Sequence, residues 1–159
     1  MMRFKLFLYS LLFIGIAAKC YSQIEMDTDG LNNLNNVYLY SLKEYCGSLD
    51  SSKRKIVYVE RNYFIGDSWP KEINGFKIIY LVSYQYKKII KENGGTITLV
   101  GISPLGLEKG NFYVAVIPFA ASYKKNVVHL SNGGGQIVNF QYDQGKKALI
   151  YKSKKWTGI

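Results

Sequence analysis

The feature that most constrains the fold is a run of short strand-like segments that fills the chain from Thr96 almost to its end. Residues that favour strands form the segments, and glycine, asparagine, aspartate and proline fill the breaks between them. Each break has a length typical of a turn between antiparallel neighbours, including the glycine-rich break at 132–135. We therefore expect five strands in this part of the chain, at residues 96–103, 112–122, 126–130, 136–142 and 148–152.

Two more strands are expected before this run, at residues 55–64 and 76–82. The first shows the period-two alternation of an amphipathic strand, and the turn dipeptide Asn74-Gly75 precedes the second. Pro118 lies inside the longest expected strand. Because proline has no backbone N–H, we expect it to mark a bend, a bulge or an edge position.

Two segments have the spacing of helices. Apolar residues recur at intervals of three and four from Leu31 to Leu49, which predicts a helix of about five turns that ends at Gly47 or in the stretch 48–52. Residues 83–95 are ambiguous, because they could extend a strand or form a short helix capped by Ser83. The sequence Asn93-Gly94-Gly95 is typical of a helix end, so we favour the helix.

Two helices among six or seven strands predict an α+β domain. In this domain an N-terminal amphipathic helix and a short second helix pack on a curved antiparallel sheet of about six strands. The outline resembles the cystatin-like and NTF2-like rolls. No sequence motif accompanies this similarity, which is one of shape.

The beginning of the chain has the pattern of a secretory signal peptide. Arg3 and Lys5 precede an apolar run at residues 6–18, which is too short to span a bilayer. We expect cleavage after Ser22, with cleavage after Cys20 or Ala18 as alternatives. Lys19 stands where a lipoprotein signal needs a small residue, so lipid attachment to Cys20 is not expected. The expected mature protein is one domain of residues 23–159, and no later stretch has the pattern of a membrane anchor.

Charge and cysteine content limit the function classes. The chain carries a net charge of +10, and removal of the leader would take away Arg3, Lys5 and Lys19 while leaving the domain basic. Cys46 would then be the one remaining cysteine, so no intramolecular disulfide is expected. Export to the periplasm or the exterior makes nucleic acid an improbable partner.

Catalytic chemistry has little support in the sequence. Cys46 and His129 are the only thiol and imidazole after the expected cleavage site, and their spacing matches no known dyad. One histidine and one cysteine fall short of a zinc site, so we expect neither a metal nor another cofactor. The carboxylates are scattered, and none of them is nominated as part of a pair. An envelope or extracellular hydrolase acting on polysaccharide or peptide remains the alternative function.

The C-terminal segment offers the best candidate binding surface, because it places several lysines around one tryptophan. Aromatic and cationic side chains together suit an acidic protein or an anionic polysaccharide. A solvated edge strand protected by lysines is the simpler interpretation of the same residues. The candidate binding residues are Tyr142, Tyr151, Lys154, Lys155 and Trp156. We thus expect a small secreted or periplasmic binding protein without catalytic activity, of the inhibitor or immunity type.

Overall fold

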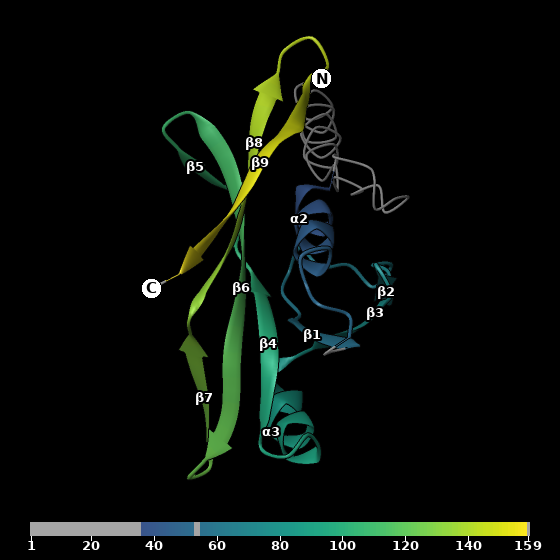
Figure 1. Cartoon of the computed structure of the whole chain (residues 1–159), viewed down its shortest axis with the longest axis vertical. Coiled ribbons are helices and arrows are strands. Elements are labelled where there is room, and N and C mark those ends of the chain that lie inside the picture. Colours follow the sequence, from purple (N-terminus) through teal and green to yellow (C-terminus); the bar gives the residue numbers. More distant parts are fainter. Residues whose placement is uncertain (1–35, 53–54, 159) are drawn as a thin grey trace, which may run out of the picture.

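The computed structural model describes residues 36–52 and 55–158, which form an α+β fold. Two helices and nine strands lie in these residues, and all nine strands belong to one long, twisted sheet (Figure 1). The signal peptide, its cleavage site and the first turns of the expected N-terminal helix lie outside the described residues. Neither helix of the described part is long and apolar enough to cross a membrane.

The strands follow the order β2-β3-β1-β4-β6-β8-β9 across the sheet, and β5 and β7 also pair with β6. The bounds are β1 Ile56–Glu60, β2 Glu72–Ile73, β3 Phe76–Leu81, β4 Thr96–Ile102, β5 Gly106–Glu108, β6 Asn111–Lys124, β7 Val127–Asn132, β8 Gly134–Asp143 and β9 Ala148–Gly158. All seven expected strands are present. β2 and β5 were not expected, because two or three residues are too few for a visible alternation.

The sheet is mixed, so the expectation of an antiparallel sheet of about six strands is wrong in strand number and in part of the pairing. β1 pairs in parallel with both β3 and β4, whereas the other pairs are antiparallel. The connections are the cause: the loop and β2 between β1 and β3, and α3 between β3 and β4, each return the chain to the end of the sheet where the preceding long strand began. These parallel pairs also depart from the antiparallel roll that the outline resembles.

Both helices end where the sequence predicts. α2 (Val37–Cys46) follows Asn36, whose side-chain oxygen accepts a hydrogen bond from the Leu39 N–H at 3.0 Å, and Gly47 caps its C-terminus. α3 (Ser83–Glu92) is capped by Asn93. Ser83 is the first helical residue and not the cap. Instead, the side-chain oxygen of Gln85 accepts a hydrogen bond from the Val82 N–H at 3.0 Å.

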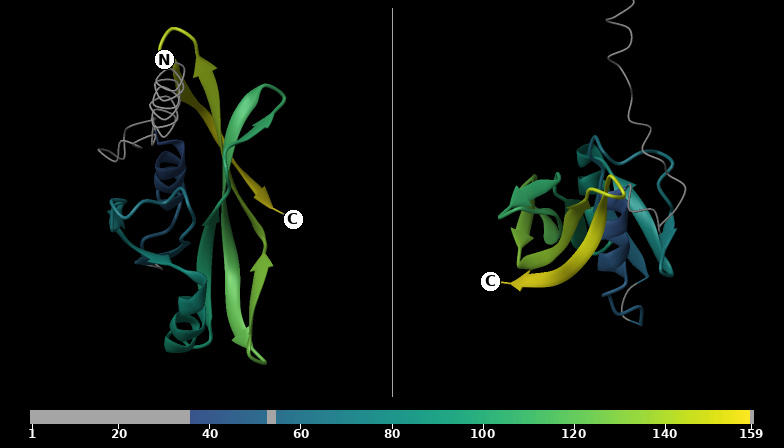
Figure 2. Two further views of the ribbon diagram at one scale, coloured as in Figure 1. Left: turned by 180° about the vertical axis from the view of Figure 1, so that it is seen from behind. Right: turned by 90° about the horizontal axis from the view of Figure 1, so that it is seen from above.

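The helices cover opposite faces of the parallel part of the sheet, because side chains alternate along each strand. On β4, Val100 and Ile102 belong to a large core under α2, whereas Ile97 and Leu99 belong to a smaller core under α3. Figure 1 shows α2 beside the upper half of the sheet and α3 at its lower end. Viewed along the long axis, α2 lies between the C-terminal strand and the parallel strands (Figure 2).

β6 is the spine of the sheet and explains the position of Pro118. β8 pairs with β6 as far as Val116, and β7 pairs with it from Phe119 onward. The Ala115 carbonyl accepts a hydrogen bond from the Ser103 N–H, so the backbone groups of Ala115 point toward β4. Backbone groups alternate between the two sides along a strand, so those of Pro118, three residues later, point toward β7 and β8. Pro118 therefore lies between the two partner strands, where the missing N–H breaks no ladder hydrogen bond. This agrees with the edge-type position expected from the sequence.

The glycine-rich break at 132–135 is not the hairpin turn that its sequence suggests. β7 and β8 both run antiparallel to β6, so they follow one another along the same side of it. The break is therefore a short joint between collinear strands. Gly134 has a φ of 119°, a backbone conformation that glycine adopts readily and other residues rarely do.

Candidate binding surfaces

The expected binding residues lie mainly on β9, an edge strand of the sheet. β9 pairs with β8 over its whole length, and Trp156 lies opposite Gln136. The register shifts between Asn139 and Phe140, so that Lys152 is an extra residue on β9. Tyr151 before this bulge and Lys154 and Trp156 after it consequently lie on the same side of the sheet, toward α2.

Three of the five expected residues contact α2 and form the β9–α2 seam. The Trp156 ring lies 5.9 Å from the ring of Tyr45, which is buried, although Trp156 itself is 52% exposed. The Lys154 ammonium lies 2.8 Å from the Glu44 carboxylate. The Tyr151 ring lies 5.5 Å from that of Tyr40. The seam comprises Tyr40, Glu44, Tyr45, Tyr151, Lys154 and Trp156.

Two polar side chains at or beside the seam, Tyr40 and Gln136, are partly or fully shielded from solvent. Burial, together with the neighbouring Glu44 carboxylate, raises the pKa of Tyr40, so its phenol stays neutral at physiological pH. Gln136, opposite Trp156, is fully buried, and its amide nitrogen lies 3.4 Å from the Ser48 hydroxyl. The amide oxygen of Gln136 has no hydrogen-bond partner among the described residues.

The other two expected residues lie apart from the seam contacts. Lys155 is on the opposite side of β9, where it lines a hollow of about 190 Å³ with Tyr113 and Asn139. Tyr142 is 49% exposed and pairs with Leu149 near the β8–β9 turn. The structure thus brings together Tyr151, Lys154 and Trp156, but it does not bring Lys155 or Tyr142 into that group.

Cys46 and His129 do not form a catalytic pair. Cys46 is fully buried in the core under α2, and burial raises the pKa of its thiol to about 12. The thiol therefore stays protonated at physiological pH, when a nucleophile would need the thiolate. His129 is exposed on β7, opposite Ser122. Within residues 36–52 and 55–158, no three side chains of histidine, cysteine, aspartate or glutamate are grouped as metal ligands.

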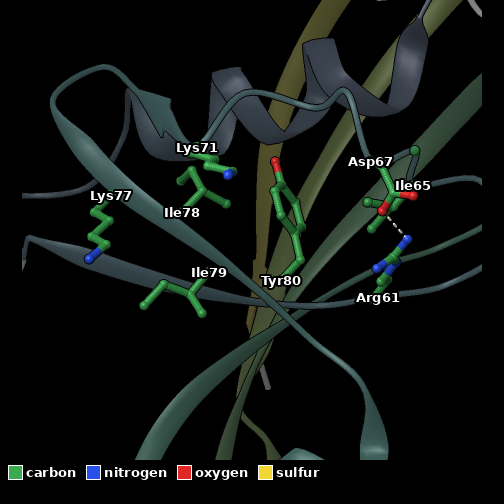
Figure 3. Close-up of a pocket in the computed structure, with 9 residues that line it drawn as sticks. Arg61, Ile65, Asp67, Lys71, Lys77, Ile78, Ile79 and Tyr80 are labelled. Atoms are coloured by element: carbon green, nitrogen blue, oxygen red, sulfur yellow. Dashed lines mark hydrogen bonds and ion pairs between the residues drawn. The ribbon is translucent and has the colours of Figure 1, made fainter.

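A second surface, which we call the β3-edge pocket, lies at the opposite end of the strand order. It has a volume of about 530 Å³ and lies between β3 and the loop that follows β1 (Figure 3). The Arg61–Asp67 ion pair lies at one end of the pocket, and Lys71 and Lys77 lie at the other. Its lining residues are Arg61, Ile65, Gly66, Asp67, Lys71, Lys77, Ile78, Ile79 and Tyr80.

Tyr80 fixes the shape of this pocket. Its hydroxyl donates a hydrogen bond to the Pro70 carbonyl at 2.9 Å, and its ring lies edge-on to that of the buried Trp69. Burial and the neighbouring Cys46 raise the pKa of Tyr80 well above its ordinary value of 10.0. The phenol therefore remains a hydrogen-bond donor, and it ties the loop to the strand.

Sequence reasoning did not single out the residues of the β3-edge pocket. Arg61, Lys71 and Lys77 lie on either side of turns and a short strand, and no motif joins them. The available signal was the Asn74-Gly75 turn, whose residues have φ values of 51° and 79°. This turn predicts a hairpin, and it would have paired Glu72 and Ile73 with the start of β3.

Comparisons with protein families, curated proteins and solved structures add no relative to this description. No protein family, no curated protein and no solved structure matches the chain. Its function is therefore argued from its own residues.

Proposed function

We propose that the protein is a small exported binding protein without catalytic activity, which captures an acidic protein partner in the manner of an inhibitor or an immunity protein. The signal-peptide pattern supports export to the periplasm or the exterior. The domain stays basic after loss of the three cationic residues of the leader, and this charge favours an acidic partner. The β9–α2 seam is the proposed contact surface.

The observation that carries this proposal is the half-exposed Trp156 ring against the buried Tyr45 ring. Tryptophan, tyrosine and arginine dominate the energetics of protein interfaces, because their large side chains become desolvated on binding. Trp156 is held by its contact with α2 before any partner arrives, so little side-chain entropy remains to be lost. An exposed, pre-positioned tryptophan is the arrangement expected of a binding hot spot.

The surrounding charge suits an acidic partner. Lys154 is 38% exposed although it pairs with Glu44, and Lys155 lies on the other side of the same strand. Neighbouring cations on an interface rim accelerate association with an anionic protein and disfavour other partners. A partner that covers the seam would thus meet an aromatic centre beside the Lys154–Glu44 pair, while Lys155 adds positive charge on the other side of the strand.

The test is affinity capture with the purified protein, followed by mass spectrometry of the proteins that bind. We expect an acidic partner that is retained by the wild type and lost on Trp156→Ala. Tyr84→Ala is the matched control, because Tyr84 is 83% exposed on α3, away from the seam. Equal loss in both variants, or turnover of a peptide or glycan by the wild type, would overturn the proposal. An anionic polysaccharide in place of a protein would overturn the choice of partner.

A further inference from the structure

We infer that the β3-edge pocket binds an extended, acidic polypeptide segment, which adds to β3 as a further strand. This site is separate from the β9–α2 seam, and its argument does not depend on the function proposed for that seam. It rests on the course of the pocket, the free backbone of β3, the position of the loop and the charges that border the pocket.

The pocket runs along the edge of β3 and not over one of its faces. Successive side chains of a strand point to opposite faces of the sheet. Nevertheless, four consecutive residues of β3, from Lys77 to Tyr80, line the pocket. Ile78 and Tyr80 belong to the core side under α2, whereas Ile79 packs on the core under α3. Residues from both faces can border one pocket only where that pocket follows the strand edge.

The backbone of β3 has an open position within this pocket. The Lys77 N–H donates to the Lys55 carbonyl and the Leu81 carbonyl accepts from the Arg61 N–H, so these residues of β3 face β1 and its continuation. Backbone groups of successive residues in a strand point to opposite edges. Tyr80 directly precedes Leu81, so its N–H and carbonyl point away from β1, to the outer edge of β3. β2 is the only described strand on that side, and it pairs with Phe76 and Lys77 alone. No strand in the described ranges reaches the backbone of Tyr80.

The loop leaves room for a strand at this point. The Ile78 N–H still donates to the Lys71 carbonyl at 2.8 Å, which continues the β2 pairing by one step. If this register continued, the Tyr80 N–H would donate to the Trp69 carbonyl, but no such backbone hydrogen bond forms within the described ranges, and only the phenol of Tyr80 reaches the loop, at the Pro70 carbonyl. The chain has therefore moved away from the β3 backbone here, and the resulting pocket of about 530 Å³ falls within the size range of ligand sites.

The bordering charges favour acidic side chains in the added segment. Arg61, Lys71 and Lys77 line the pocket, and Asp67 is the one carboxylate among the lining residues. Asp67 is already paired with Arg61, whereas neither Lys71 nor Lys77 has an ion pair within the described ranges. Glu72 lies opposite Lys77 on β2 but does not line the pocket. Strand addition would thus combine backbone hydrogen bonds with cationic side-chain contacts.

The test uses the full chain and a panel of synthetic eight-residue peptides that alternate glutamate with valine or threonine. The panel includes both alternation registers, and matched peptides carry lysine in place of glutamate. We expect the glutamate peptides to bind and the lysine peptides not to bind. Amide hydrogen exchange at Tyr80 should be fast in the free protein and slow in the complex, while Ile79 and Leu81, which face β1, should be protected in both.

Charge reversal separates this site from general attraction to a basic protein. Lys71→Glu combined with Lys77→Glu should weaken binding of the glutamate peptides by about tenfold or more. The control, Lys124→Glu with Lys125→Glu in the β6–β7 turn, changes the net charge equally and should leave the affinity within about twofold. Trp156→Ala should also retain binding, so a failure of the seam proposal would be distinguishable from a failure of this one.

Three results would overturn the inference. The first is the absence of binding by every glutamate peptide up to millimolar concentration. The second is peptide binding that leaves the Tyr80 amide unprotected, or complete displacement of the peptide by inorganic phosphate at an equal concentration of charge. Either result shows an anion site without strand addition. The third is equal loss of affinity in the two charge-reversal variants, since that shows a diffuse electrostatic effect.

Discussion

The two edges of the sheet differ in how they are protected from pairing with other chains. β9 is an eleven-residue strand, and it carries Lys152, Lys154 and Lys155 and one bulge. Charged side chains and bulges both discourage a further strand from pairing with an edge. β3 is instead covered by the two-residue β2 and by the loop after β1.

Under the two proposals above, each edge would bind its partner in a different way. On β9 the lysines and the bulge disfavour backbone pairing, whereas the side chains of the β9–α2 seam are accessible. A partner would therefore contact side chains there. On β3 the pairing with β2 ends before Tyr80, so a partner would form hydrogen bonds with the backbone there. Adjacent residues of α2 touch both regions, because Tyr45 packs on Trp156 and Cys46 acts on the pKa of Tyr80. The following changes test this contrast, from the largest expected effect to the smallest.

Gly134→Ala should disrupt the β9 edge most severely. The added Cβ would clash with the Thr157 carbonyl oxygen, and the φ of 119° disfavours any side chain. Backbone strain and overpacking together predict a loss of about 3 kcal/mol in the free energy of unfolding. Urea denaturation measures it. Gly133→Ala is the control, because a Cβ there meets nothing within 4 Å, and an equal loss in both variants would contradict the β8–β9 pairing.

Alkaline pH should reveal the buried thiol that lies near Tyr80. Burial raises the pKa of Cys46 in the folded protein from 9.0 to about 12, so the folded state holds the thiol proton more tightly. The resulting stability is complete below about pH 9 and is lost as the pH rises toward 12. Relative to Cys46→Ala, the wild type should therefore lose about 2 kcal/mol of unfolding free energy by pH 11.

Denaturation of both proteins under reducing conditions, at pH 7 and pH 11, measures this effect. Cavity formation should make Cys46→Ala less stable by about 1 kcal/mol at pH 7. The order of stability should then reverse at pH 11. The raised pKa values of Tyr80 and Tyr86 also weaken the fold at high pH, and burial, the main cause of both shifts, acts in both proteins. A difference that stays constant with pH would show that the thiol is accessible.

Tyr80→Phe should loosen the cover of the β3 edge at a smaller energetic cost. The change removes the hydrogen bond to Pro70 and leaves the ring packing in place. A loss of about 1 kcal/mol is expected, with faster amide exchange at Trp69 and Lys71. Tyr84→Phe on α3 should change neither quantity. Unchanged exchange in the Tyr80 variant would indicate that the loop is held by other contacts.

The sequence predicted most elements, because each depends on local patterns. The strands from Thr96 onward, apart from β5, and both helix ends follow from alternation, spacing and turn residues. The parallel pairing of β1 was missed for a physical reason. Val57 and Val59 alternate with Tyr58, which looks like a strand with one exposed face, although Tyr58 packs on the α3 core. Local periodicity does not report that a tyrosine is covered by a distant helix.

The candidate surfaces show the same limit. Trp156 and Lys154 were selected from composition, and the structure places them together in the seam. Lys155 was not separated from them, because the expected strand ended at residue 152, whereas β9 continues to Gly158 and its alternation puts Lys155 on the other face. The β3-edge pocket left no signal besides the Asn74-Gly75 turn, since a loop brings Arg61 and Lys71 to the same strand edge only after folding.

The smallest effect concerns the ion pair in the seam. Lys154→Met keeps most of the aliphatic stem but removes the ammonium 2.8 Å from Glu44. Both side chains are partly exposed, so a loss of only about 0.5 kcal/mol is expected, and it should shrink in high salt. Lys155→Met has no ion pair to lose among the described residues and should change stability by less than about 0.3 kcal/mol.

A double-mutant cycle with Glu44→Gln isolates the coupling between Glu44 and Lys154. A coupling near 0.5 kcal/mol would mean that the pair positions the lysine beside Trp156 before a partner binds. In that case Lys154→Met should weaken partner capture more than Lys155→Met does. Zero coupling would leave Lys154 as a mobile surface charge. In that case, the contact between the Trp156 and Tyr45 rings would alone support the role of the β9 edge in this contrast.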